Sequence, residues 1–320
     1  MSDSAASLDE ATVGGVGEAQ RIGRPPQSLA RLAWQRFRRH RMAMVGATLL
    51  FVIVLYVTVG ALVFSEHYAN RNDLTSTLQS PSATHPFGTD GTGRDIMART
   101  VYGGQISIVI GLLAVVVSLV VGVLIGAIAG FYGGIVDSLL MRFTEAMMNI
   151  PQLFLLIILG KMLGGKIPSF ELLGRTLSGS VVVIIGVIGL TSWMYLARIV
   201  RANYLGLKER EFITAARCLG TRNWFIIFRH ILPNTVAPIV VAATLGVASA
   251  IISEAYISFL GLGVQPPTAT WGNMLDQAYH HLDTEPWMWF FPGMLIVLTV
   301  LSINFLGDGL RDALDPRSQR

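Results

Sequence analysis

The chain has 320 residues, of which 52% are hydrophobic and only 14% are charged, and its formal net charge is +4. A soluble domain carries about 25% charged residues. Because the apolar residues here also gather in long runs, the composition excludes an ordinary soluble protein and favours a membrane protein. The single cysteine, Cys218, excludes an internal disulfide.

The N-terminal segment, residues 1–28, lacks periodicity and is rich in Ala, Ser, Gly and acidic residues, which predicts a disordered cytoplasmic tail. In the segment 29–41, Leu29, Ala33 and Phe37 recur at helical spacing among arginines, which predicts an amphipathic interfacial helix at the inner membrane surface. Nucleic-acid binding by these arginines is the weaker alternative, because a membrane-length apolar run follows at once. That run is too long for a signal peptide and lacks a cleavage site.

Six apolar segments approach or exceed the roughly 20 residues that a helix needs to cross a bilayer. They are residues 42–64, 106–129, 143–163, 181–197, 236–252 and 286–306. With the N-terminus inside, about three times as many Lys and Arg residues fall inside as outside, which predicts that both termini are cytoplasmic. The expected fold is therefore an all-α integral membrane protein of about six transmembrane helices, with a membrane domain over 42–310 and a cytoplasmic tail over 311–320.

Small and ionisable residues mark parts of these spans. Gly122, Gly126, Gly130 and Gly134 recur every four residues along the second span and beyond it, which favours close helix packing within the chain and leaves a subunit contact as an alternative. An ionisable group in a membrane is a functional candidate. Glu254, near the outer end of the fifth span, is a translocation-path candidate, whereas Glu145 has Arg142 as a local partner at helical spacing.

Two patterns that resemble chemical sites do not meet their requirements. The run from Gly160 to Lys166 follows a phosphate-loop pattern, but Ile167 stands where a magnesium-binding Ser or Thr is needed, and no strand precedes it. The chain therefore has no nucleotide site of its own. The histidines form no metal-binding motif. His280 and His281, with acidic neighbours, leave only a weak metal site as an alternative to a solvated loop.

The basic cytoplasmic loop 204–234 is too long for a simple turn. Its pattern predicts a helix over 209–219 that ends at Gly220. A second helix, capped by Asn223, is expected to stop at Pro233. Two short helices joined by a glycine predict a rigid unit that docks another protein, although a loop lying on lipid headgroups fits the same facts.

At this loop the sequence resembles the permeases of ABC importers. Their signature is Glu-Ala-Ala, three residues, Gly, nine residues, Ile, one residue, Leu-Pro. The same spacing is found here in Thr214-Ala215-Ala216, Gly220, His230 and Leu232-Pro233. Thr214 replaces the signature Glu and His230 replaces the Ile, so Glu211, one turn earlier, is the alternative carboxylate.

Over residues 31–316 the chain is similar to the oligopeptide/dipeptide branch of these permeases. The resemblance rests on Phe87-Gly-Thr-Asp90-Gly-Thr-Gly93-Arg94-Asp95, Arg229-His-Ile-Leu-Pro-Asn234, Ser258-Phe-Leu-Gly-Leu-Gly263, Gln265-Pro-Pro267, Trp271-Gly272 and the run from Gly307 to Pro316. This branch also carries nickel and other small solutes, so peptide transport has nickel, haem or another small solute as alternatives.

The resemblance implies a type I ABC importer permease fold in the bacterial inner membrane, without a cofactor or covalent chemistry of its own. It also implies a second, similar permease, two ATP-binding subunits that hydrolyse ATP, and an outer solute-binding protein. The residues implied in ATPase docking are Glu211, Phe212, Thr214, Ala215, Ala216, Arg217, Gly220 and Pro233. Functions of another class remain as alternatives: a multi-span membrane enzyme, or an ion-driven carrier that acts alone.

Overall fold

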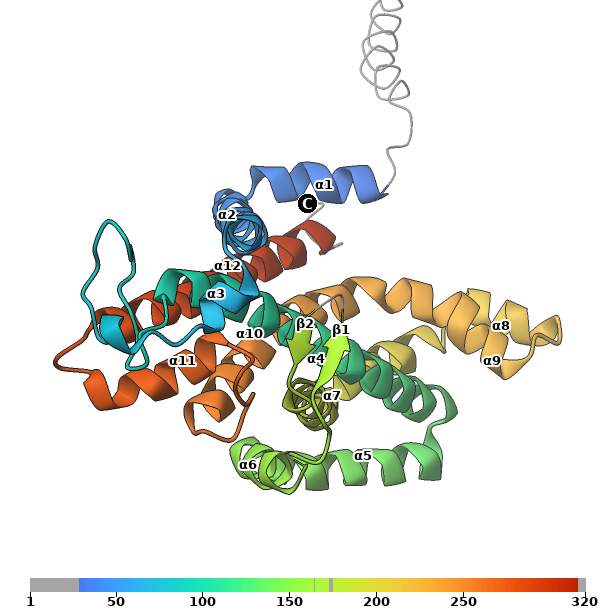
Figure 1. Ribbon diagram of the computed structural model, residues 1–320. Helices are drawn as coiled ribbons and strands as arrows, with labels where there is room; N and C mark the ends of the chain where they lie inside the picture. The colour runs from blue at the N-terminus through green and yellow to red at the C-terminus, as the bar shows by residue number, and fades with distance from the viewer. Residues whose placement is uncertain (1–28, 164, 173–174, 316–320) are drawn as a thin grey trace, which may run out of the picture.

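The computed structural model describes residues 29–163, 165–172 and 175–315 (Figure 1). The tail predicted over 1–28 and the end of the tail predicted over 311–320 lie outside these ranges. The elements in chain order are α1 Leu29–Arg39, α2 Arg41–Val63, α3 Glu66–Asn70, η2 Leu74–Ser76, α4 Ile96–Tyr132, α5 Gly134–Asn149, α6 Gln152–Leu163, β1 Phe170–Leu172, β2 Arg175–Leu177, α7 Ser180–Leu207, α8 Glu211–Cys218, α9 Asn223–Phe225, η3 Ile226–Ile231, η4 Leu232–Thr235, α10 Val236–Phe259, α11 Trp271–Ala278, η5 Tyr279–His281 and α12 Trp287–Leu314.

Five stretches of helix are long and apolar enough to cross a membrane, and the bent pair α5 and α6 supplies a sixth crossing if it counts as one span. Five of the six predicted spans are thus single long helices. The prediction of one continuous span over 143–163 is wrong, because α5 and α6 meet at 84°. Ile150 is extended there and is followed by Pro151, which has no N–H to donate and disfavours a helical residue before it.

The two ends of the described chain lie side by side, as Figure 1 shows for α1 and the end of α12. Phe37 of α1 and Ala43 of α2 pack against Ala313 of α12. The Arg36 guanidinium donates a hydrogen bond to the carbonyl oxygen of Asp315, at 3.2 Å. Both ends on one side require an even number of crossings, which agrees with six spans and with the predicted orientation.

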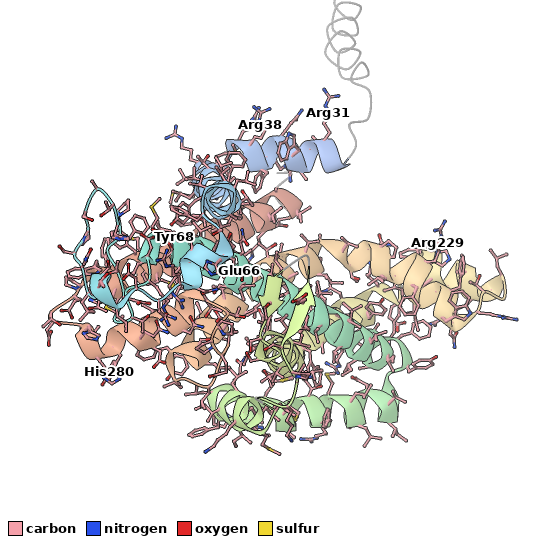
Figure 2. All side chains as sticks on the ribbon, viewed as in Figure 1. Arg31, Arg38, Glu66, Tyr68, Arg229 and His280 are labelled. Atoms are coloured by element: carbon pink, nitrogen blue, oxygen red, sulfur yellow. The ribbon has the colours of Figure 1, made fainter. Side chains whose placement is uncertain are left out.

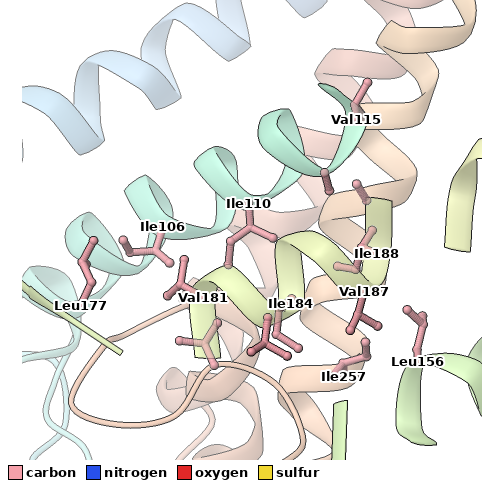
Figure 3. Packing of buried hydrophobic residues seen from close by; sticks show 14 residues of the cluster. Ile106, Ile110, Val115, Leu156, Leu177, Val181, Ile184, Val187, Ile188 and Ile257 are labelled. Atoms are coloured by element: carbon pink, nitrogen blue, oxygen red, sulfur yellow. The ribbon is translucent and has the colours of Figure 1, made fainter. Parts of the chain in front are cut away.

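The centre of the fold is the packing of α4 against α7. Isoleucine and valine side chains of the two helices interlock around Ile110 and Ile184 (Figure 3). Nearer the cytoplasmic end, the glycine stripe of α4 lies at the contact with α7. A Cβ at Gly126 would lie there only 2.4 Å from the carbonyl oxygen of Ala197. The stripe therefore lets the backbones of α4 and α7 touch, which confirms packing within the chain.

The segment 64–95 between α2 and α4 packs with α11 and the start of α12 and forms what we call the outer lobe, and a small hairpin completes the fold. The hairpin pairs β1 with β2 in antiparallel register, a departure from the all-α prediction. In the outer lobe, Phe87 stacks on Phe291 with ring centroids 3.9 Å apart. Asp95 caps α4 by accepting a hydrogen bond from the Ala98 amide, at 2.8 Å, and also bonds His85. The motif over 87–95 thus fixes the outer end of α4.

Candidate functional site

The loop predicted over 204–234 is a compact lobe at the cytoplasmic end of α7 and α10, and we call residues 208–235 the docking lobe. Figure 1 shows α8 and α9 projecting from the other helices. α8 begins at Glu211 and ends at Cys218, close to the predicted 209–219. Gly220 has φ +74°, its amide donates to the Arg217 carbonyl, and the Thr221 amide donates to the Ala216 carbonyl. This glycine-terminated turn confirms the predicted stop.

The second helix of the lobe differs from the prediction at both of its ends. Arg222 occupies the cap position without a side-chain hydrogen bond, and Asn223 is already the first helical residue, so the predicted Asn223 cap is wrong. The helical run does not end at Pro233 either, because α9, η3, η4 and α10 follow one another without a break. Pro233 lies in the first turn of η4, inside this continuous helical run. η3 is a π-helix, a form that occurs often at functional sites.

The inner face of the docking lobe is apolar and packs on the ends of α4 and α7. Ile213 and Ala216 of α8, with Ile226 and Ile231 of the following turns, are buried around Tyr204. The Tyr204 hydroxyl donates a hydrogen bond to the Ile227 carbonyl oxygen, at 3.1 Å. The lobe is therefore tied firmly to the membrane helices.

The outer face of the lobe exposes large apolar side chains. Leu219 is 85% exposed and Trp224 is 59% exposed, and Phe212 and Phe228 are also exposed. The lobe also carries exposed arginines, among them Arg229, which Figure 2 labels on this lobe. Clustered exposed apolar residues with a charged rim are typical of a protein-binding surface.

The sequence-predicted docking residues divide between these two faces. Seven are exposed: Glu211, Phe212, Thr214, Ala215, Arg217, Gly220 and Pro233. Ala216 is only 7% exposed and belongs to the inner face, so the Ala215–Ala216 pair does not present one small surface to a partner. The exposed Leu219 and Trp224 were missed, because the sequence alone does not show which face of α8 packs against Tyr204.

A membrane cavity of about 410 Å³ lies between α4, α7, α10 and the break between α5 and α6. Its polar lining consists of hydroxyl and amide side chains, namely Ser118, Gln152, Thr191, Ser192, Tyr195 and Ser249, and the rest is apolar. The lining includes no Asp, Glu, Lys, Arg or His. Such a neutral surface accepts uncharged polar groups, including peptide groups, without a fixed charge preference.

Glu254 lies elsewhere, fully buried where α10 meets α4 and the segment before α11. Its carboxylate accepts hydrogen bonds from the hydroxyls of Ser107, at 3.0 Å, and Ser258, at 2.8 Å. These hydroxyls in turn accept from the amides of Trp271 and Val264. The structure therefore does not bring Glu254 to the cavity, and its role in the path stays a prediction.

The remaining candidates have local partners. Glu145 is exposed and pairs with Arg142 at 3.7 Å, as the spacing predicts. His281 bonds the Glu285 carboxylate at 2.8 Å. Within the described ranges, no three His, Cys, Asp or Glu side chains are grouped so that they could hold a metal ion.

Comparison with known proteins agrees with this geometry. A family model described as the binding-protein-dependent transport system inner membrane component matches residues 122–320. A second model, for the N-terminal TM domain of oligopeptide transport permease C, matches residues 28–81.

Curated relatives cover most of the chain. A protein of Brucella suis biovar 1, named as a peptide permease, is 44% identical over 89% of this chain and 90% of its own length. The dipeptide transport system permease DppC of Alkalihalophilus pseudofirmus is 41% identical over 90% of both chains. The oligopeptide transport system permease OppC of Bacillus subtilis is 38% identical over 98% of both.

Among solved structures, the inward-facing MetNI methionine ABC transporter aligns with a TM-score of 0.52 at 19% identity, over 69% of this chain and 98% of that one. At this identity the likeness concerns the fold alone. The chain belongs to the inner membrane components of binding-protein-dependent transport systems, and it has the fold of a type I ABC importer permease.

Proposed function

We propose that this chain imports peptides as one of two permease subunits that share a translocation path and are driven by two ATP-binding subunits. The peptide substrate is supported by the relatives, whose names specify dipeptide and oligopeptide permeases, and by the neutral cavity. An outer solute-binding protein delivers the peptide to the outer lobe. A transport assay that includes nickel and haem distinguishes these alternative solutes from peptides.

The observation that carries this proposal is the outer face of the docking lobe. An ATPase subunit would seat on Leu219, Trp224 and Phe212, with Arg217 and Glu211 at the rim. A cluster of large apolar side chains in the cytosol needs a partner to cover it. Thr214 is exposed where the family signature has a carboxylate, so the contact rests on shape, apolar area and the rim charges.

The chain carries out no covalent step in this mechanism. ATP binding closes the ATPase subunits, and the docking lobe moves with the subunit that holds it. Because the lobe is packed on the ends of α4 and α7, its motion changes which packing of the spans is favoured. The cavity then opens to one side of the membrane or the other.

Co-purification tests the docking. Leu219→Glu and Trp224→Ala are each expressed with the ATPase, partner permease and binding-protein genes, and the tagged chain is recovered from membranes. We expect both variants to insert and to lose most of the bound ATPase. Leu74→Glu is the matched control, since Leu74 is also highly exposed but lies in the outer lobe. ATPase recovery at the wild-type level in both lobe variants would exclude this surface.

We also propose that α1 lies on the inner membrane surface, as its sequence pattern predicts. Figure 1 looks along the axis of α2, and α1 lies across that direction. Arg38 and Arg31 point away from the helix bundle (Figure 2), and Trp34 is exposed beside them. The expected result is that anionic lipid raises the thermal stability of the chain in nanodiscs. Arg38→Glu should remove this gain, and Arg142→Glu, an exposed position on α5, should leave it intact.

A further inference from the structure

A bidentate ion pair joins α5 to α7 at the cytoplasmic side of the membrane. Arg201 Nε lies 2.5 Å from Asp137 Oδ1, and the Arg201 terminal nitrogen lies 2.6 Å from Asp137 Oδ2. Asp137 is mostly buried and Arg201 is partly buried. Two parallel charge-assisted bonds in partly buried surroundings hold both the distance and the orientation of the two helices.

Apolar contacts join the later turns of α5 to α7, where Phe143 stacks on Trp193 with ring centroids 6.1 Å apart and Met147 packs beside it. At the start of α5, by contrast, Ile135, Val136 and Leu139 are exposed. α5 is joined to α4 through Gly133 and Gly134, with φ of +68° and +54°. Its side chains are largely exposed, and the two that are buried are Met141 and Thr144. Within the described part of the chain, Arg201–Asp137 is the only ion pair that links α5 to another helix. The two glycines give the start of α5 freedom to move relative to α4, and the ion pair holds that start against α7.

The two helices that the Asp137–Arg201 pair joins lead to different parts of the molecule. Arg201 precedes the end of α7 by six residues, on the turns that lead into the docking lobe. At the other end, α5 leads to the break with α6, and Met148, Ile150, Pro151 and Gln152 line the membrane cavity. Gln152 also donates a hydrogen bond to the Ser192 hydroxyl, at 3.2 Å.

We propose that Asp137 and Arg201 are positioning residues that transmit motion of the docking lobe to the α5–α6 break, and so set the shape of the cavity. When α7 moves with the lobe, the ion pair makes the start of α5 follow. Without the pair, α7 moves and α5 lags behind. This inference rests on the proposed function, because it needs an ATPase on the lobe and a solute in the cavity.

The test measures solute transported per ATP hydrolysed by the complete complex in proteoliposomes, with a peptide mixture and the binding protein. Asp137→Asn should keep complex assembly and ATP hydrolysis but lower the ratio about fivefold or more, as expected for loss of one coupling free energy. Arg201→Lys, which keeps the charge but not the fork, should fall between. Asp283→Asn, at an exposed carboxylate of the outer side, should match the wild type. A wild-type ratio for Asp137→Asn would overturn the proposal.

A second measurement replaces the ion pair by a covalent link. Asp137→Cys and Arg201→Cys are combined in a Cys218→Ser background and joined with a short bifunctional thiol reagent. If the two residues move together, cross-linking restores the ratio that the double substitution lost. Loss of all transport on cross-linking would show that they must separate, which overturns the proposal. Failure of the wild-type chain to assemble with ATPase subunits would instead refute the proposed function.

Discussion

The Tyr204 hydroxyl and the Leu232 amide donate hydrogen bonds to the same acceptor, the carbonyl oxygen of Ile227. Tyr204 lies near the end of α7, whereas Leu232 follows the π-helical turn η3 that leads into α10. The shared carbonyl thus joins the two membrane helices that border the docking lobe. A π-helical turn widens the backbone by one residue, and here the phenol stabilises it from the side.

Tyr204→Phe tests this connection. The substitution removes one buried hydrogen bond but leaves Ile227 its main-chain donor, so we expect a cost of about 1 kcal/mol. Hydrogen–deuterium exchange of the amides in 223–235 should speed up about fivefold. Tyr132→Phe, at an exposed tyrosine beside Phe131, is the control and should leave those rates unchanged. Equal exchange in Tyr204→Phe would show that packing alone holds the turn.

Gly220→Ala tests the turn between the two halves of the lobe. Nothing lies within 4 Å of an added Cβ at Gly220, so the cost comes from its φ of +74°, about 1–2 kcal/mol for a residue with a Cβ. Local opening of 211–222 should rise, and recovery of the ATPase subunit should fall. Gly206→Ala is the matched control, since that site is equally open and its φ is not positive. If both substitutions behave alike, backbone strain at Gly220 is unimportant.

The parts of this fold that sequence predicts are those with local causes. Runs of about 20 apolar residues predict spans wherever they occur. Gly220 ends α8 because only a few neighbouring backbone groups decide the turn. Pro151 and Pro233 show the limit of such reasoning. Both lie near helix ends, yet one accompanies an 84° bend and the other sits in a helical run that continues for many residues.

The candidate sites depend on partners that are distant in sequence. Ser107, which bonds Glu254, lies 147 residues away, and Arg201 lies 64 residues from Asp137. A single sequence carries no signal for either pair. The exposure of Leu219 and Trp224 likewise depends on which face of α8 meets Tyr204, and that is fixed only when α4 and α7 are packed.

Low pH should destabilise the outer lobe through Asp90. Its burial alone would raise the pKa, but Arg94, Arg99 and hydrogen bonds from Arg94 and Thr92 lower the pKa of Asp90 below its usual range. A carboxyl whose pKa is lower folded than unfolded contributes stability above its unfolded pKa, about 4. That contribution disappears as pH falls through the folded pKa.

Thermal unfolding of the detergent-solubilised chain should therefore lose stability below about pH 4. Asp90→Asn should be less stable at neutral pH and should lose less on acidification. Asp283→Asn, at an exposed carboxylate of the outer side, is the control and should keep the wild-type profile. A parallel pH profile for Asp90→Asn would place the acid-sensitive group elsewhere.

Two substitutions, compared with each other, can assign the role of Glu254. Glu254→Gln keeps an acceptor for one of the two serine hydroxyls and the size of the side chain. Glu254→Ala leaves both Ser107 and Ser258 without their acceptor, and each orphaned buried group costs about 1–3 kcal/mol. If the carboxylate serves to orient these serines, thermal stability and transport should fall together, slightly for Gln and strongly for Ala. If it serves the translocation path instead, Glu254→Gln should lose transport while its unfolding temperature stays at the wild-type value. Transport per ATP and the unfolding temperature, measured on the same preparations, decide between these roles.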